Sequence, residues 1–153
     1  MRRQTAGTRK ASRRISPIGT GVASDRATLG RRAELAAVDY LIAQGFGILA
    51  RNLRVGALEI DIVARRGPLV VAVEVRTRGP GAYERALESI GPAKQARLLA
   101  AVDRLWSSRL AKMPDVDRVR IDVAAVRFEH GRTLVEYVTD AVGPRVVQRR
   151  GNR

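Results

Sequence analysis

Three carboxylates interrupt a segment that is otherwise rich in apolar residues, namely Glu59, Asp61 and Glu74 within residues 58–78. A carboxylate placed among buried residues costs free energy unless it is paired, protonated or bound to a cation. Two carboxylates held close together repel each other, and a divalent cation would remove that penalty. Mg²⁺, or Mn²⁺ in its place, is commonly held by one or two carboxylates together with a substrate phosphate. The segment therefore predicts a metal site at Asp61 and Glu74.

A cationic side chain, Arg76, lies two residues after Glu74 and completes a pattern of Asp, a longer gap, and Glu-x-Arg. A divalent ion in such a site polarises a phosphoryl oxygen and acidifies a bound water. A neighbouring cation stabilises the negative charge that develops in the transition state. The pattern is therefore typical of metal-dependent phosphodiester hydrolysis. The other interpretation is an exposed polar face in which Glu59 and Glu74 pair with Arg76 and Arg78 across the strands.

Whether these charged groups meet depends on strand register, because residues 58–65 and 69–78 are expected to form antiparallel strands joined by a tight turn. Alternation predicts that Glu59 and Asp61 share one face of the first strand, and that three apolar residues take the other: Leu58, Ile60 and Ile62. The second strand carries its charged residues on one face: Glu74, Arg76 and Arg78. A register that pairs residues whose numbers sum to an odd value brings the charged groups together, and an even sum separates them.

The net charge of +14 over 153 residues favours a polyanionic partner, and nucleic acid is the first candidate. Aromatic residues make up only 4% of the chain, so base stacking on a single-strand platform is weakly supported. The chain has no cysteine, which excludes disulfides and zinc-thiolate sites. No apolar run approaches the length of a membrane span, and the N-terminus lacks the apolar stretch of a secretory signal. We therefore expect no membrane partner and a cytoplasmic location, with an organellar transit peptide as the alternative.

The elements that must position the carboxylates are expected within one domain, residues 28–143. Residues 1–27 are predicted to be a disordered basic arm, which either contacts phosphate backbones or is a plain extension. Residues 144–153 form a second basic tail. Thr28 is the expected N-cap of the first helix, which ends at Gly45.

Apolar periodicity then predicts helix, three strands, helices and two strands. The expected ranges are a helix over 29–45, strands over 46–54, 58–65 and 69–78, a loop with a short helix over 79–92, a helix over 93–110, and strands over 119–129 and 133–142. Strands interleaved with helices favour an α/β layer over an all-β sandwich.

Several motifs in this order resemble the YraN-like family of bacterial predicted endonucleases, an uncharacterised group distantly related to archaeal Holliday-junction resolvases. The resemblance runs from residue 29 to about residue 141. The motifs are Gly30 with Glu34, Arg51-Asn52-Leu53-Arg54, Leu58-Glu59-Ile60-Asp61, Val73-Glu74-Val75-Arg76-Thr77-Arg78, Lys94 with Arg97-Leu98, and Arg120 with Asp122.

This resemblance implies a restriction-endonuclease-like α/β fold, a mixed β-sheet flanked by helices. It implies that Asp61 and Glu74 are metal ligands, and that Glu34 is an accessory ligand or a water-orienting acid. The alternative for Glu34 is a solvated helix residue paired with Arg31 or Arg32. Asp122 is expected to fix local geometry rather than bind metal. A homodimer is expected because a DNA junction offers two symmetric strands.

The sequence departs from the family pattern at two places. Leu58 stands where the family usually has Gly and is expected to narrow the approach of backbone or substrate. Arg76 stands where the family usually has Lys; it keeps the charge but does not serve readily as a base. Lys94 would supply an ammonium group instead, unless it is a solvated helix lysine.

Three functions follow. The first is an Mg-dependent endonuclease acting on DNA, with branched or damaged DNA as candidate substrates. It would bind phosphates through Arg51, Arg54, Arg76, Arg78, Lys94 and the basic tails. The second is a binding module of the same fold that has lost the chemistry, which Arg76 favours. The third is a basic structural or ribosome-associated protein, in which the strand carboxylates form salt bridges.

Overall fold

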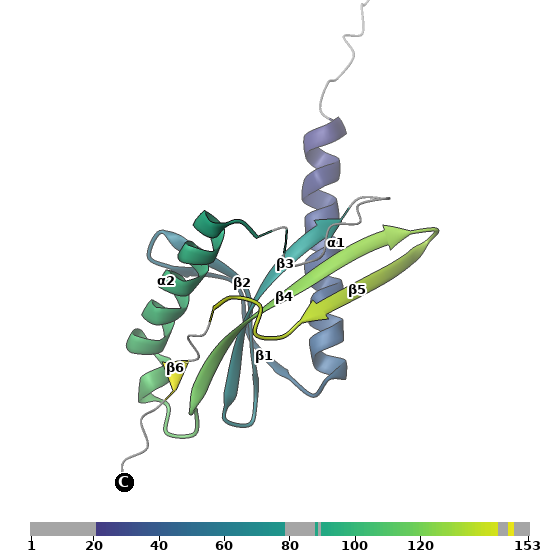
Figure 1. Cartoon of the computed structure of the whole chain (residues 1–153). Coiled ribbons are helices and arrows are strands. Elements are labelled where there is room, and N and C mark those ends of the chain that lie inside the picture. The colour runs from purple at the N-terminus through teal and green to yellow at the C-terminus, as the bar shows by residue number, and fades with distance from the viewer. Residues whose placement is uncertain (1–20, 79–87, 89, 144–146, 149–153) are drawn as a thin grey trace, which may run out of the picture.

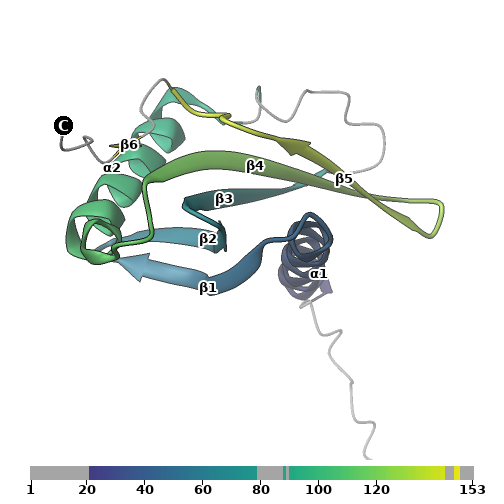
Figure 2. The same cartoon turned by 90° about the horizontal axis from the view of Figure 1, so that it is seen from below.

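The computed structural model describes residues 21–78, 88, 90–143 and 147–148. The elements are α1 (Gly21–Ala43), β1 (Gly47–Val55), β2 (Leu58–Arg66), β3 (Leu69–Arg78), α2 (Pro92–Ser108), the 3-10 helix η1 (Leu110–Lys112), β4 (Arg118–Glu129), β5 (Arg132–Val138) and β6 (Val147–Gln148). A twisted mixed sheet lies between the two long helices, with α1 against one face and α2 against the other (Figures 1 and 2).

The sheet has the order β1-β2-β3-β4-β5, and β6 pairs with β4 off this path. Within the described part of the chain, only β3 and β4 are parallel; the other neighbours are antiparallel. A tight turn cannot join parallel strands, so the chain leaves β3 and returns to β4 through a long connection that includes α2. That crossover brings the N-terminal end of α2 back towards β3.

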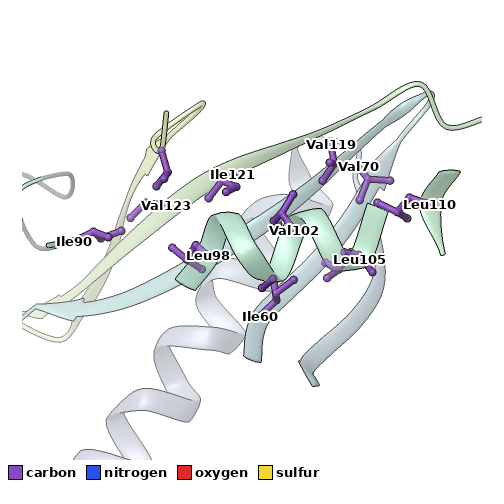
Figure 3. Packing of buried hydrophobic residues seen from close by; sticks show 14 of the residues in the cluster. Ile60, Val70, Ile90, Leu98, Val102, Leu105, Leu110, Val119, Ile121 and Val123 are labelled. Carbon is purple, nitrogen blue, oxygen red and sulfur yellow. The ribbon is translucent and has the colours of Figure 1, made fainter. Parts of the chain in front are cut away.

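Each face of the sheet has its own core. On the α2 face, Leu98, Val102 and Leu105 of the helix pack over Ile60 of β2 and over side chains of β3 and β4 (Figure 3). On the α1 face, Ala37 and Leu41 pack against a second set of buried residues: Ile62, Ala64, Leu69, Val71, Val73 and Ala124. Burial on both faces explains why β3 is a nearly continuous apolar run up to Glu74.

Most predicted elements are present, with one clear error at the start. The first helix begins at Gly21, so residues 21–27, which were predicted to belong to the disordered arm, are helical. Thr28 lies inside this helix and is not its N-cap. Pro92 opens α2, a position that suits a residue lacking the backbone N–H. The predicted loop and short helix over 79–92 fall largely outside the described residues, as do most of the basic arm and tail.

The arrangement confirms the predicted α/β class. A mixed sheet flanked by helices, with the two predicted metal ligands on β2 and β3, is the restriction-endonuclease-like architecture that the motifs implied.

Candidate functional site

The strands β2 and β3 pair in the register that the site requires. Their partners run from Arg66 with Leu69 to Ile62 with Val73, which is an odd-summed register. The hydrogen-bonded pairing of β2 with β3 ends at Ile62 and Val73. Asp61 and Glu74 are the next residues on the two strands, so both carboxylates lie at the point where the paired segment ends.

Asp61 is fixed by the neighbouring backbone. The Val75 N–H donates a hydrogen bond to Asp61 Oδ2 over 2.8 Å. Burial, followed by the charge of Glu74 and then that of Glu34, raises the pKa of Asp61 from its ordinary value of 3.8 to about 6. The Val75 N–H and the Lys94 ammonium act in the opposite direction. Asp61 and Glu74 therefore repel each other, which is the penalty that a divalent cation would remove.

Strict alternation fails at Asp61. Ile60 packs in the α2-side core and Ile62 in the α1-side core, so the expectation that they share a face is wrong. On β1, Arg51 pairs with Ile62 and Leu53 with Ile60, which leaves Asn52 opposite Asp61. Asn52 has φ +48°, a left-handed conformation that Asn tolerates better than most residues.

Asn52 and its neighbour Arg51 hold the predicted acid of α1. Asn52 Nδ2 donates to Glu34 Oε2 over 3.2 Å, and Arg51 Nη2 lies 3.4 Å from the same oxygen. The alternative pairing of Glu34 with Arg31 or Arg32 is not what the structure shows. Asn52 received no separate role from the sequence alone, although an Asn inside a predicted strand is a signal for irregular backbone.

Glu74 is the most buried of the acids at this site, with a side chain that is 3% exposed. Its Oε1 lies 3.1 Å from Lys94 Nζ and 3.9 Å from Arg76 Nη1. Its Oε2 is buried, and no described residue donates a hydrogen bond to it. The interpretation of Lys94 as a merely solvated lysine is therefore wrong, since α2 delivers its ammonium to the carboxylate.

These observations fit a metal held by two carboxylates. A buried carboxylate oxygen without a partner is costly, and coordination by a cation would satisfy Glu74 Oε2. Within the described part of the chain, no three or more Asp, Glu or His side chains gather as a metal cluster. Glu34 is therefore not placed as a third ligand. Two carboxylates with water and substrate oxygens are a usual ligand set for Mg²⁺.

The remaining predicted residues divide between the site and its edge. Arg76 and Arg78, together with Val75 and Thr77, line a cavity of about 380 Å³ formed by the four residues that follow Glu74 on β3. Glu59 does not join the carboxylates; it is 45% exposed and lies 3.8 Å from Arg54 Nε. Both members of that pair belong to the edge formed by β1 and β2.

Asp122 is engaged in a structural network, as predicted. The Arg120 guanidinium donates to both of its oxygens at 2.7 and 2.8 Å, and the Tyr137 hydroxyl and Asp140 N–H donate as well. Burial and the Asp122 charge raise the pKa of Tyr137. Asp122 thus joins β4 to the end of β5 and is not directed at the carboxylate pair.

None of the helices in the described ranges combines the length and the apolar character needed to cross a membrane.

Comparison with known proteins gives a consistent family and no activity. A model described as "Uncharacterised protein family UPF0102" matches residues 33–126. A UPF0102 protein of Sorangium cellulosum is 48% identical over 128 residues, which cover 83% of this chain and 89% of that protein. A UPF0102 protein of Chloroflexus aurantiacus is 44% identical over 116 residues, covering 75% and 92% respectively. One from Anaeromyxobacter dehalogenans is 38% identical over 117 residues, covering 76% and 85%.

Proposed function

The chain belongs to the UPF0102 (YraN-like) family, and from the geometry of its site we propose that it is a divalent-metal-dependent endonuclease that hydrolyses DNA phosphodiester bonds. The observation that carries the proposal is Glu74 Oε2, a buried carboxylate oxygen without a described hydrogen-bond donor, next to the pKa-raised Asp61. The excess of cationic residues supports a polyanionic substrate.

Asp61 and Glu74 would hold Mg²⁺ or Mn²⁺, which when bound polarises a phosphoryl oxygen and lowers the pKa of a water. The chain's own residues position the rest. The Val75 N–H fixes the Asp61 carboxylate, and Lys94 fixes that of Glu74. Arg76, which lines the adjacent cavity, would bind a phosphate oxygen and stabilise developing charge.

Glu34 is suited to orient the attacking water. Its carboxylate is held by Asn52 and Arg51, and its charge acts on Asp61. An acid that is anchored on one oxygen and close to the carboxylate pair can accept a proton or a hydrogen bond from water. We assign it this role rather than that of a metal ligand.

Lys94 supplies an ammonium group at a site where Arg76 stands in place of the family's usual lysine. The family's usual strand lysine is replaced by Arg76, but α2 supplies an ammonium group 3.1 Å from Glu74. Arginine remains protonated and suits phosphate binding. The division of roles is therefore phosphate binding by Arg76 and placement of Glu74 by Lys94.

The second candidate is a nucleic-acid-binding module without chemistry. The Lys94–Glu74 ion pair favours it, because the ammonium partly neutralises the carboxylate without any metal. In that case DNA binding would be insensitive to divalent cations and no cleavage would occur.

Cleavage of branched and linear DNA with Mg²⁺ or Mn²⁺ separates the two. Asp61→Asn and Glu74→Gln keep side-chain shape while removing the charge, and Glu136→Gln on the exposed part of β5 is the matched control. An endonuclease loses cleavage in both site variants and keeps it in the control. Cleavage that survives both site substitutions contradicts the proposal, and metal-independent binding without any cleavage supports the module.

A further inference from the structure

We propose that a basic groove between α2 and the β1–β2 turn binds the sugar-phosphate backbone of one arm of the DNA substrate, leading it away from the carboxylate pair. The inference deepens the proposed function and rests on it for the identity of the nucleic acid. The groove is defined by Lys94, Arg97, Arg104 and Arg109 on the helix side and by Arg54 on the turn side.

Two neighbouring hollows form the groove. The first, of about 150 Å³, is lined by Lys94 and Arg97 of α2 and by Ala57 and Leu58 at the turn. The second, of about 380 Å³, is lined by Arg104, Arg109, Ser107 and Ser108 and by Arg54 and Gly56. Gly56 and Ala57 are consecutive, so the two hollows adjoin at the turn. Leu58, at the position where Gly is usual, forms part of the wall.

Helical spacing aligns the cations along this groove. Lys94, Arg97 and Arg104 recur at intervals that keep them on one side of α2, and buried Ala101 lies between them. Arg97, Arg104 and Arg109 are exposed, and no ion pair among the described residues involves them.

Among the described residues, Glu59 is the one acid that lines either hollow. It lies 3.8 Å from Arg54. The groove is therefore strongly positive overall.

The turn leaves room for the Arg104 side chain. Gly56 has φ +64°, and a Cβ at that position would lie 2.5 Å from Arg104 Nη1. The guanidinium thus lies over the glycine, and a larger residue would displace it. The partial negative charge at the C-terminus of α2 opposes anion binding there, but two guanidinium groups within the same hollow, together with Arg54, outweigh a half charge.

The groove starts at the site and has a defined length. Lys94 Nζ is 3.1 Å from Glu74 Oε1, so the first cation already contacts a proposed metal ligand. From Lys94 to Arg104 the helix rises about 15 Å at roughly 1.5 Å per residue. One strand of B-DNA advances about 3.4 Å per nucleotide, so this distance spans roughly four to five nucleotides. A row of forked guanidinium groups suits an extended phosphodiester backbone.

Binding of DNA to the full chain in EDTA tests the groove independently of cleavage. The groove variant is Arg97→Ala, Arg104→Ala and Arg109→Ala together. The control variant removes the same charge from exposed arginines elsewhere: Arg31→Ala, Arg118→Ala and Arg132→Ala. Fluorescence anisotropy measures the Kd as a function of salt concentration. The DNA ligands are branched molecules in which one duplex arm is lengthened by one base pair at a time.

We expect the slope of log K against log salt to become shallower by about 2 to 3 in the groove variant and by less than about 1 in the control. The wild type gains affinity until an arm reaches roughly five base pairs, and the groove variant does not. Equal slopes in the two variants, or no dependence on arm length in the wild type, overturn the inference. Arg104→Glu alone, expected to weaken binding on the order of tenfold, gives a second readout.

The two failures are distinguishable. If the protein never cleaves but the groove variant loses binding, the groove stands and the endonuclease proposal fails. If cleavage requires Asp61 and Glu74 while groove and control variants bind alike, only the groove is wrong.

Discussion

Asn52 of β1 donates a hydrogen bond to Glu34 of α1, with 3.2 Å between Nδ2 and Oε2. The contact ties the first helix to the one residue of β1 that has a left-handed backbone, directly opposite Asp61. A local irregularity in the sheet thereby holds an acid from one element near a carboxylate of another. Two changes at Asn52 separate the backbone effect from the hydrogen bond.

Asn52→Ala is expected to lower the free energy of unfolding by about 1–3 kcal/mol, because it removes the hydrogen bond and places alanine in a left-handed conformation that asparagine tolerates better. Asn52→Gly also loses the hydrogen bond but relieves the strain, so it should be less destabilising by about 1 kcal/mol. Urea denaturation measures both. If the alanine variant is as stable as the glycine variant, the backbone at Asn52 is not strained as described.

Asp61 should make stability fall as pH rises. Its pKa is about 6 in the folded chain and near 3.8 when unfolded, so between these values the folded state keeps a proton that the unfolded chain has lost. Ionised Asp61 therefore costs stability above about pH 6. Without metal, Asp61→Asn should stabilise the protein at about pH 8 by an amount on the order of 1–3 kcal/mol, and this gain should vanish near about pH 3.5.

Chemical denaturation at the two pH values, in EDTA, measures this difference. Asp103→Asn, at an exposed position of α2, serves as the control and should change stability little at either pH. An Asp61→Asn effect of equal size at the acidic and the alkaline pH would contradict the raised pKa.

Lys94→Met tests the ion pair with Glu74. Removing the ammonium leaves a buried carboxylate, so we expect a loss of about 1–3 kcal/mol in stability at neutral pH, since the lysine itself is partly exposed. If Glu74 binds metal, Mg²⁺ should raise the Tm of this variant more than that of the wild type, because the cation replaces the lost charge. Arg97→Met, which removes an exposed cation from the next turn of α2, is the matched control. An unchanged response to Mg²⁺ would count against Glu74 as a ligand.

Arg76→Lys distinguishes an adapted site from a degraded one. Because Lys94 already contacts Glu74, we expect Arg76→Lys to keep the cleavage rate within a few-fold and Arg76→Ala to lower it by about 10²-fold. Single-turnover rates with excess protein give both numbers. A lysine variant that gains activity by orders of magnitude would show that the natural Arg76 site has lost its chemistry.

The carboxylate pair could be predicted from the sequence because two properties of β2 and β3 are local. A short turn indicates the antiparallel pairing, and the apolar run indicates which positions are buried, but the sequence leaves the register open. The structure shows the odd-summed register, in which Asp61 and Glu74 lie opposite each other. The change of face between Ile60 and Ile62 could not be predicted, because it coincides with a left-handed residue, Asn52, that lies opposite Asp61 in a different strand.

Local sequence patterns also could not predict which side chains contact Glu34 and Glu74. Lys94 reaches Glu74 only because the crossover brings α2 back over the sheet, a tertiary effect that the spacing of residues 74 and 94 does not encode. The start of α1 at Gly21 was not predicted because a local signal was misleading. Thr28 is a residue type that often caps a helix, but the helix continues through it.

The central claim is that Asp61 and Glu74 hold one divalent cation, and crystals of the full chain soaked in Mn²⁺ test it most directly through anomalous scattering. The account predicts one peak within coordination distance of an Asp61 oxygen and of Glu74 Oε2, which disappears in Glu74→Gln crystals. No peak at these oxygens at a saturating Mn²⁺ concentration, or a peak that persists in the Glu74→Gln protein, would contradict it.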